Sequence, residues 1–95
     1  MEFDVEFLLG AEIEFLDLYS RRGDAFYFVF DNCLEQIRHF PNSAPIYSHP
    51  FHSLLIPKTP FGIFHAIEGK RVFVHAVLDL RMSPERIAES LKSRS

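Results

Sequence analysis

Four side chains in the C-terminal half of the sequence have the types that acid–base or anion-binding chemistry requires. His75, Asp79 and Arg81 recur at even spacing in the segment VFVHAVLDLR, so an extended chain would place them on one side. The preceding segment FGIFHAI carries His65. Imidazole exchanges protons near neutral pH, and a guanidinium binds phosphate or carboxylate through paired hydrogen bonds. If His65 faces the same side as His75, the four residues could act on a phosphodiester. The hairpin register decides this, and the sequence leaves it ambiguous.

The same residues also have structural interpretations, and the sequence does not choose between them. A histidine in an apolar strand is more often packed and hydrogen-bonded than catalytic. Arg81 could pair with Asp79 or cap the sheet edge instead of contacting a target. Two further candidates for binding a target are Lys58, in an exposed connection between two prolines, and Arg86, near the C-terminus.

Neither a metal nor a cofactor is expected. His49 and His52 have the spacing of a weak metal-binding pair, but further ligands are lacking nearby, and Cys33 lies in the apolar stripe of a helix. The sequence has no glycine-rich phosphate loop and no G-x-S-x-G motif. We therefore expect any binding or catalysis to depend on the side chains of the protein alone.

Apolar periodicity predicts the elements that would position these residues. Alternating apolar and acidic residues over 3–7 predict a half-buried strand. Helical spacing follows over about residues 11–21, and again over 24–40, where Asp24 could cap the second helix. Three prolines predict a loop at 41–50. The remaining segments predict strands at about 52–57, 61–67 and 72–80, the last two joined by a tight turn at 68–70, and a short helix that Ser83 caps.

The predicted order is β-α-α-β-β-β-α, which is an α+β architecture in a single domain of residues 1–95. We expect an antiparallel sheet with the two-helix hairpin packed on one face. Val72, Val74, Ala76 and Leu78 would lie under the helices. The opposite face would then be uncovered, with Arg81 at its rim.

Composition places the chain among small globular proteins. Of its 95 residues 47% are hydrophobic, including eleven Phe, which is enough to fill a core. A single cysteine cannot form an internal disulfide, and its presence fits a reducing cytosol. The acidic N-terminus lacks the features of a signal peptide, and no apolar run approaches the ~18 residues that cross a bilayer. We therefore expect a cytoplasmic protein with no membrane partner.

Charge is distributed unevenly along the sequence. The formal net charge is −3, which gives no general attraction to nucleic acid. Residues 1–36 carry nine acidic side chains against Arg21 and Arg22, whereas residues 70–95 carry six basic side chains against three acidic ones. The folded chain should therefore present two differently charged faces, of which the C-terminal one is better suited to an anion.

Several segments resemble the RelE/ParE superfamily of bacterial toxins, and its ParE, or plasmid stabilisation, branch more than the RelE branch. The similarity covers nearly the whole chain: the first strand, the helix motif AEIEFLDLY, the segment LEQIRHFP and above all PFGIF, EG, VFVHAVL and LRMSP. The chain departs from RelE-like members at Gly62, where an arginine is usual, and at Met82, where a second arginine is usual. Its pI of about 5.9 is also lower than that of these usually basic toxins.

The resemblance implies the toxin of a type II toxin–antitoxin module, held inactive by a cognate antitoxin; a homodimer or a heterotetramer with the antitoxin stays open. ParE-like members act on DNA gyrase. RelE-like members cut messenger RNA on the ribosome, for which His65, His75, Asp79 and Arg81 would be the catalytic set. Because several basic residues of the RelE branch are missing, gyrase binding is our first hypothesis and mRNA cleavage the second. A degenerate, non-toxic member is the third.

Overall fold

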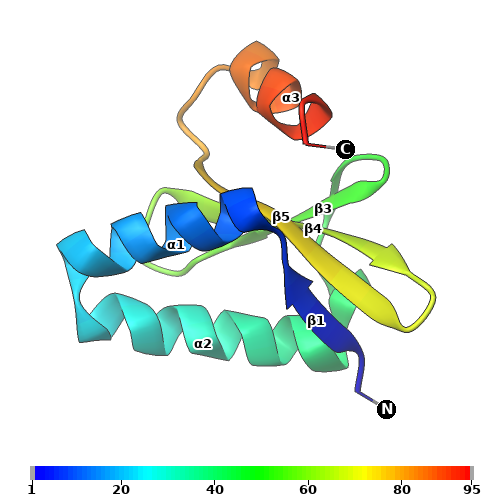
Figure 1. Ribbon diagram of the computed structural model, residues 1–95, viewed down its shortest axis with the longest axis horizontal. Helices are drawn as coiled ribbons and strands as arrows, with labels where there is room; N and C mark the ends of the chain where they lie inside the picture. Colours follow the sequence, from blue (N-terminus) through cyan, green and yellow to red (C-terminus); the bar gives the residue numbers. More distant parts are fainter. Residues whose placement is uncertain (1, 95) are drawn as a thin grey trace.

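The computed structural model describes residues 2–94, which form one sheet and three helices (Figure 1). The α+β class and the two-helix hairpin are as predicted. The elements are β1 (Asp4–Phe7), α1 (Leu9–Arg22), α2 (Asp24–His39), a 3₁₀ turn (Pro41–Ser43), β2 (Ile46–Ser48), β3 (Phe51–Leu55), β4 (Phe61–Glu68), β5 (Arg71–Asp79) and α3 (Pro84–Lys92). The observed order therefore has one strand more than predicted.

The additional strand is β2, in the segment that three prolines had indicated as a loop. Its three residues are all exposed, and Ile46 pairs with His52 of β3 at the edge of the sheet. A strand this short has no periodicity of its own and forms because β3 offers it a partner, so the loop prediction was wrong there.

The sheet has the order β1-β5-β4-β3-β2, and it is mixed. The hairpin strands β3, β4 and β5 pair antiparallel, whereas β1 runs parallel to β5 with Val5 opposite Val72. The prediction of an antiparallel sheet was therefore wrong for β1. Alternation of apolar and polar residues shows which face of a strand is buried, but it does not show the direction of the neighbouring strand.

The helix hairpin covers one face of the sheet and encloses the larger core cluster. Phe26, Phe30, Cys33 and Ile37 of α2 are buried against it, as the predicted apolar stripe requires. Asp24 was expected to cap α2, but Gly23 holds the capping position with a positive φ of 79°. The Asp24 carboxylate instead accepts a hydrogen bond of 2.8 Å from the Tyr19 hydroxyl, which ties the start of α2 to the end of α1.

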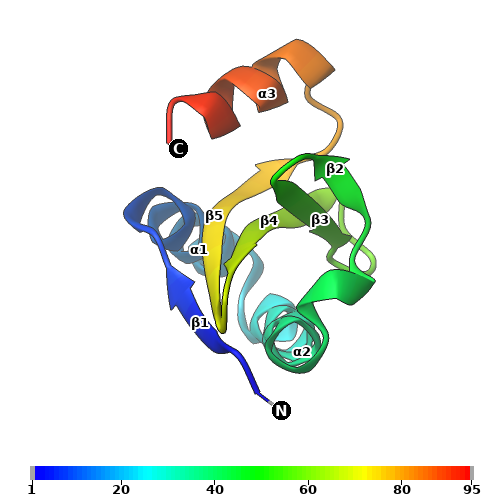
Figure 2. The same ribbon diagram turned by 90° about the vertical axis from the view of Figure 1, so that its right-hand side faces the viewer.

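The opposite face is covered by α3, which lies across the sheet from α2 in Figure 2. Ile87 and Leu91 pack on this face, and the Ser83 hydroxyl accepts a hydrogen bond from the backbone N–H of Arg86, which confirms the predicted cap. The expectation of an uncovered face was wrong. The helix predicted at the C-terminus supplies the apolar side chains that close it.

A β-bulge in β5 changes which residues face the helix hairpin. Phe64 pairs with Ala76, but the next residue, His65, pairs with Val74, so His75 is an extra residue on β5. Val72 and Val74 pack under the helix hairpin as predicted. After the bulge the alternation is reversed, and Ala76 and Leu78 belong to the cluster under α3. Their assignment to the helix-hairpin face was therefore wrong.

Candidate functional site

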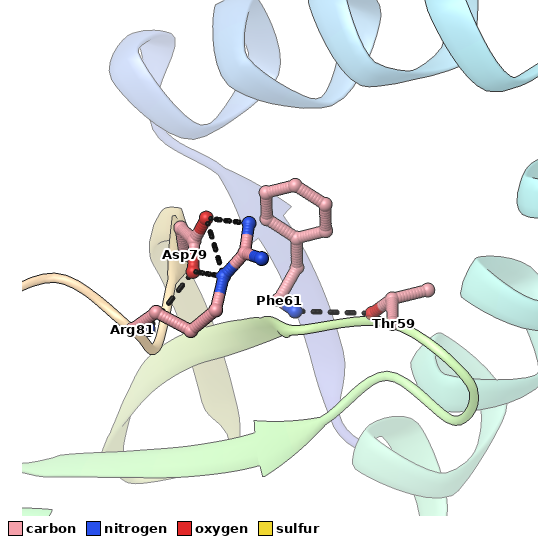
Figure 3. Close-up of polar contacts among 4 residues, drawn as sticks. All are labelled: Thr59, Phe61, Asp79 and Arg81. Atoms are coloured by element: carbon pink, nitrogen blue, oxygen red, sulfur yellow. Dashed lines mark hydrogen bonds and ion pairs between the residues drawn. The ribbon is translucent and has the colours of Figure 1, made fainter.

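An exposed arginine held by a carboxylate lies where β5 ends (Figure 3). Nε and Nη2 of Arg81 donate to Oδ1 and Oδ2 of Asp79 at 3.0 and 2.7 Å, and the Arg81 backbone N–H donates to Oδ1 at 2.8 Å. Hydrogen bonds from the Arg81 side chain, followed by the one from its backbone N–H, lower the pKa of Asp79 to about 2. The carboxylate therefore stays ionised and fixes a guanidinium that is 75% exposed.

Two further arginines, from the end of α1, share a surface hollow of about 540 Å³ with this pair. The Arg22 guanidinium lies 4.9 Å from the centroid of the Phe61 ring, a cation–π distance. Arg21 makes an ion pair of 2.6 Å with Asp17. Within residues 2–94 Arg22 has no ion-pair partner. We call Arg21, Arg22 and Arg81 the arginine cluster.

The turn that leads into β4 positions the aromatic side of the cluster. The Thr59 hydroxyl donates to the Ile56 carbonyl at 2.8 Å. It accepts from the Phe61 backbone N–H at 3.0 Å (Figure 3). The same turn places Lys58, at a positive φ of 64°, in an adjoining hollow that also includes Arg22. Asp17 and Asp79 offset the charges of Arg21 and Arg81, so Arg22 and Lys58 are the cations of this region that have no carboxylate partner within residues 2–94.

The structure does not bring the two histidines to this site. His65 is fully buried on the face under the helix hairpin, where its Nε2 donates to the Pro41 carbonyl at 3.0 Å. His75 lies on the other face, with its ring 4.9 Å from that of Phe51 in an edge-on contact. The register that the sequence left ambiguous thus places His65 and His75 on opposite faces. The four-residue acid–base set does not form on one surface.

Burial makes both histidines a source of pH-dependent stability. Desolvation lowers the pKa of His65 and of His75 below the ordinary value of 6.5. The unfolded chain therefore binds more protons than the folded chain at slightly acidic pH, so stability is complete above about 6.5 and is lost as the pH falls below it. We expect urea unfolding midpoints to be highest near pH 7.5 and to decrease as the pH falls from about 6.5 to 5.5.

A His65→Gln variant provides the control for this pH dependence. The glutamine amide can still donate to the Pro41 carbonyl but does not titrate, so the midpoint should change less with pH than in the wild type. A wild-type midpoint that stays constant or rises on acidification would show that burial of the imidazoles does not control this range.

Of the remaining sequence candidates, Arg86 lies apart from the cluster. It is exposed on the first turn of α3, in a separate hollow with Met82 and Glu89. Arg21, Arg22 and Phe61 were not named as site residues from the sequence. The two arginines could have been noticed in the sequence, because they are the basic residues of an otherwise acidic N-terminal third.

Neither the family models nor the curated proteins contain a match to the chain. In the described part of the chain, no three His, Cys, Asp or Glu side chains gather as a metal site would require. None of the helices over residues 2–94 has the length and apolar character needed to cross a bilayer.

Proposed function

We propose that the chain is the toxin of a type II toxin–antitoxin module, of the ParE-like kind. It acts in the bacterial cytoplasm by binding a target protein such as DNA gyrase and is neutralised by a cognate antitoxin. The observation that carries the proposal is the exposed guanidinium of Arg81, fixed by an ionised Asp79 and flanked by Arg22 and Phe61. A fixed guanidinium beside an aromatic ring is suited to an acidic protein surface, because it binds carboxylates without first having to be ordered.

The same geometry favours binding over RNA cleavage. General acid–base catalysis needs a group that titrates near neutral pH within hydrogen-bond reach of the substrate. Asp79 is ionised and engaged by Arg81, while His65 and His75 are buried on opposite faces of the sheet. Among the described residues that line the hollow of the arginine cluster, none is therefore a group that titrates near neutral pH.

Gly62 also favours binding, since RelE-like members usually carry an arginine at this position. A Cβ atom on Gly62 would lie 3.0 Å from Cδ2 of Leu80 and 3.1 Å from the Ser53 hydroxyl. Contacts this short leave no room for a longer side chain unless Leu80 moves. Gly62 is buried and packs against Leu80 of the cluster under α3, so this chain presents no guanidinium at the position.

Induced expression in a bacterium tests the proposed toxicity. We expect the wild-type chain to arrest growth and the Arg22→Glu/Arg81→Glu variant to need at least about tenfold more protein for the same effect, because reversed charges repel an acidic target. Lys70→Glu, at the turn between β4 and β5, is the matched control and should remain toxic. Arg86→Glu reports separately on whether α3 contributes to binding.

Other outcomes of this experiment would contradict the proposal. Growth that continues at high levels of folded wild-type protein would indicate a non-toxic member of the superfamily. Growth arrest with new cuts in translated messenger RNA would indicate ribosome-dependent cleavage instead of target binding.

A further inference from the structure

An apolar groove lies between α1 and α2, with Phe7 of β1 also in its lining. Phe15 and Leu16 of α1 and Tyr27, Phe30 and Leu34 of α2 line it, and its volume is about 440 Å³. Carboxylates stand on both of its sides, Glu12 from α1 and Asp31 from α2. The groove uses a different side of α1 from the arginine cluster, whose hollow is lined by Leu18, Arg21 and Arg22.

The two carboxylates of the groove differ from every other acidic side chain of the two helices. Within residues 2–94 neither Glu12 nor Asp31 has a hydrogen-bond or ion-pair partner. The remaining four acidic side chains are all engaged: Glu14 with Arg94, Asp17 with Arg21, Asp24 with Tyr19 and Glu35 with Arg38. Because the Tyr19 hydroxyl is neutral, three of the six carboxylates, Glu12, Asp24 and Asp31, have no cationic partner among the described residues, and two of these three line the groove.

An exposed apolar ridge extends the groove along α1. Leu9, Ile13 and Leu16 are 72%, 57% and 52% exposed, and their spacing places them on one side of the helix over roughly 10 Å. Phe28, which is 67% exposed, belongs to α2. Large apolar side chains at this spacing match the anchors with which one helix packs along another. In the folded chain more than half of the surface of each of these three α1 side chains remains exposed.

We propose that this groove and ridge bind an amphipathic helix of another protein, whose apolar stripe is flanked by lysine or arginine. The apolar residues provide the area, and Glu12 and Asp31 select the charge beside it. A second copy of this chain is the weaker occupant because α1 against α1 would bring like charges together. An anionic lipid surface or a nucleic acid would be repelled by the same carboxylates. The inference goes beyond the proposed function and does not depend on it.

Two synthetic helical peptides with one shared apolar stripe would test the proposal. One carries lysine beside the stripe and the other carries glutamate at the same positions, and binding of each labelled peptide is followed by fluorescence anisotropy at low salt. We expect the basic peptide to bind the wild-type chain at least about tenfold more tightly than the acidic one. In the Glu12→Lys/Asp31→Lys variant the preference should be inverted, and Ile13→Ser/Leu16→Ser should weaken both peptides.

The control variant carries the same change of charge at sites outside the groove. Asp4→Lys/Glu89→Lys alters two exposed carboxylates on β1 and α3 and should keep the wild-type preference. Three results would overturn the proposal: equal binding of both peptides, no binding of either, or a preference that the Glu12 and Asp31 changes leave as it was. Sedimentation that shows wild-type dimers, lost in Ile13→Ser/Leu16→Ser, would assign the surface to a second copy instead.

Discussion

Replacing Phe30 with alanine is expected to lower the free energy of unfolding by about 3–5 kcal/mol, the cost typical of removing a buried aromatic side chain. Phe30 is 2% exposed, and its ring centroid lies 4.4 Å from that of Phe15, 5.9 Å from that of Phe7 and 5.8 Å from that of Phe26. These rings come from β1, α1 and α2. Deleting the Phe30 ring would therefore leave a cavity at the junction that holds the helix hairpin on the sheet.

Phe28 offers a matched control for the Phe30 change, because the same atoms are removed from the same helix. Its side chain is 67% exposed and fills no cavity, so Phe28→Ala should change stability by no more than about 0.5 kcal/mol. Urea unfolding followed by circular dichroism measures both variants. Similar losses for Phe28→Ala and Phe30→Ala would mean that the helix hairpin does not pack on the sheet as described.

Glu14→Ala is expected to cost about 2–4 kcal/mol, more than a surface ion pair would, because this carboxylate completes the backbone hydrogen bonding of β5. Beyond the end of β1, Oε1 of Glu14 accepts from the Val77 backbone N–H at 2.9 Å. The Arg94 guanidinium donates to both Glu14 oxygens, at 2.9 and 2.7 Å, and to the His75 carbonyl at 3.0 Å. Glu14 and Arg94 thus bond to backbone groups of β5 that a neighbouring strand would otherwise pair with, and they link α1 to the end of α3.

The neighbouring Glu12 serves as the control for this change, since it lies on the same helix without a partner among the described residues. Glu12→Ala should cost less than about 1 kcal/mol. In a double-mutant cycle, Glu14→Ala and Arg94→Ala should show a coupling energy of at least about 1 kcal/mol in thermal or urea unfolding. Additive effects would show that the two side chains act independently.

Much of the fold follows from local patterns, and its exceptions follow from pairing between strands. The apolar stripe of α2, the turn at Gly69 and the cap at Ser83 are local features, because each depends on residues that are close together in the sequence. The bulge at His75 is different, because it depends on how β4 and β5 align. One extra residue there moves Ala76 and Leu78 to the other face, and no alternation within β5 indicates it.

The candidate site shows the same division. The spacing of Asp79 and Arg81 allowed the sequence to suggest that they pair, because residues two apart at the end of a strand can reach each other. The structure shows this pair. The contributions of Arg22 and Phe61 could not be predicted. They depend on how the end of α1 packs against the start of β4, which is set by the core between the helix hairpin and the sheet.

Gyrase supercoiling with the purified chain tests the proposed action most directly. We expect micromolar wild-type protein to inhibit supercoiling or to trap a cleavage complex, while Arg22→Glu/Arg81→Glu has little effect and Lys70→Glu behaves as the wild type. Unchanged supercoiling and no cleavage complex at the same concentration of folded wild-type protein would contradict the proposal that the arginine cluster binds gyrase.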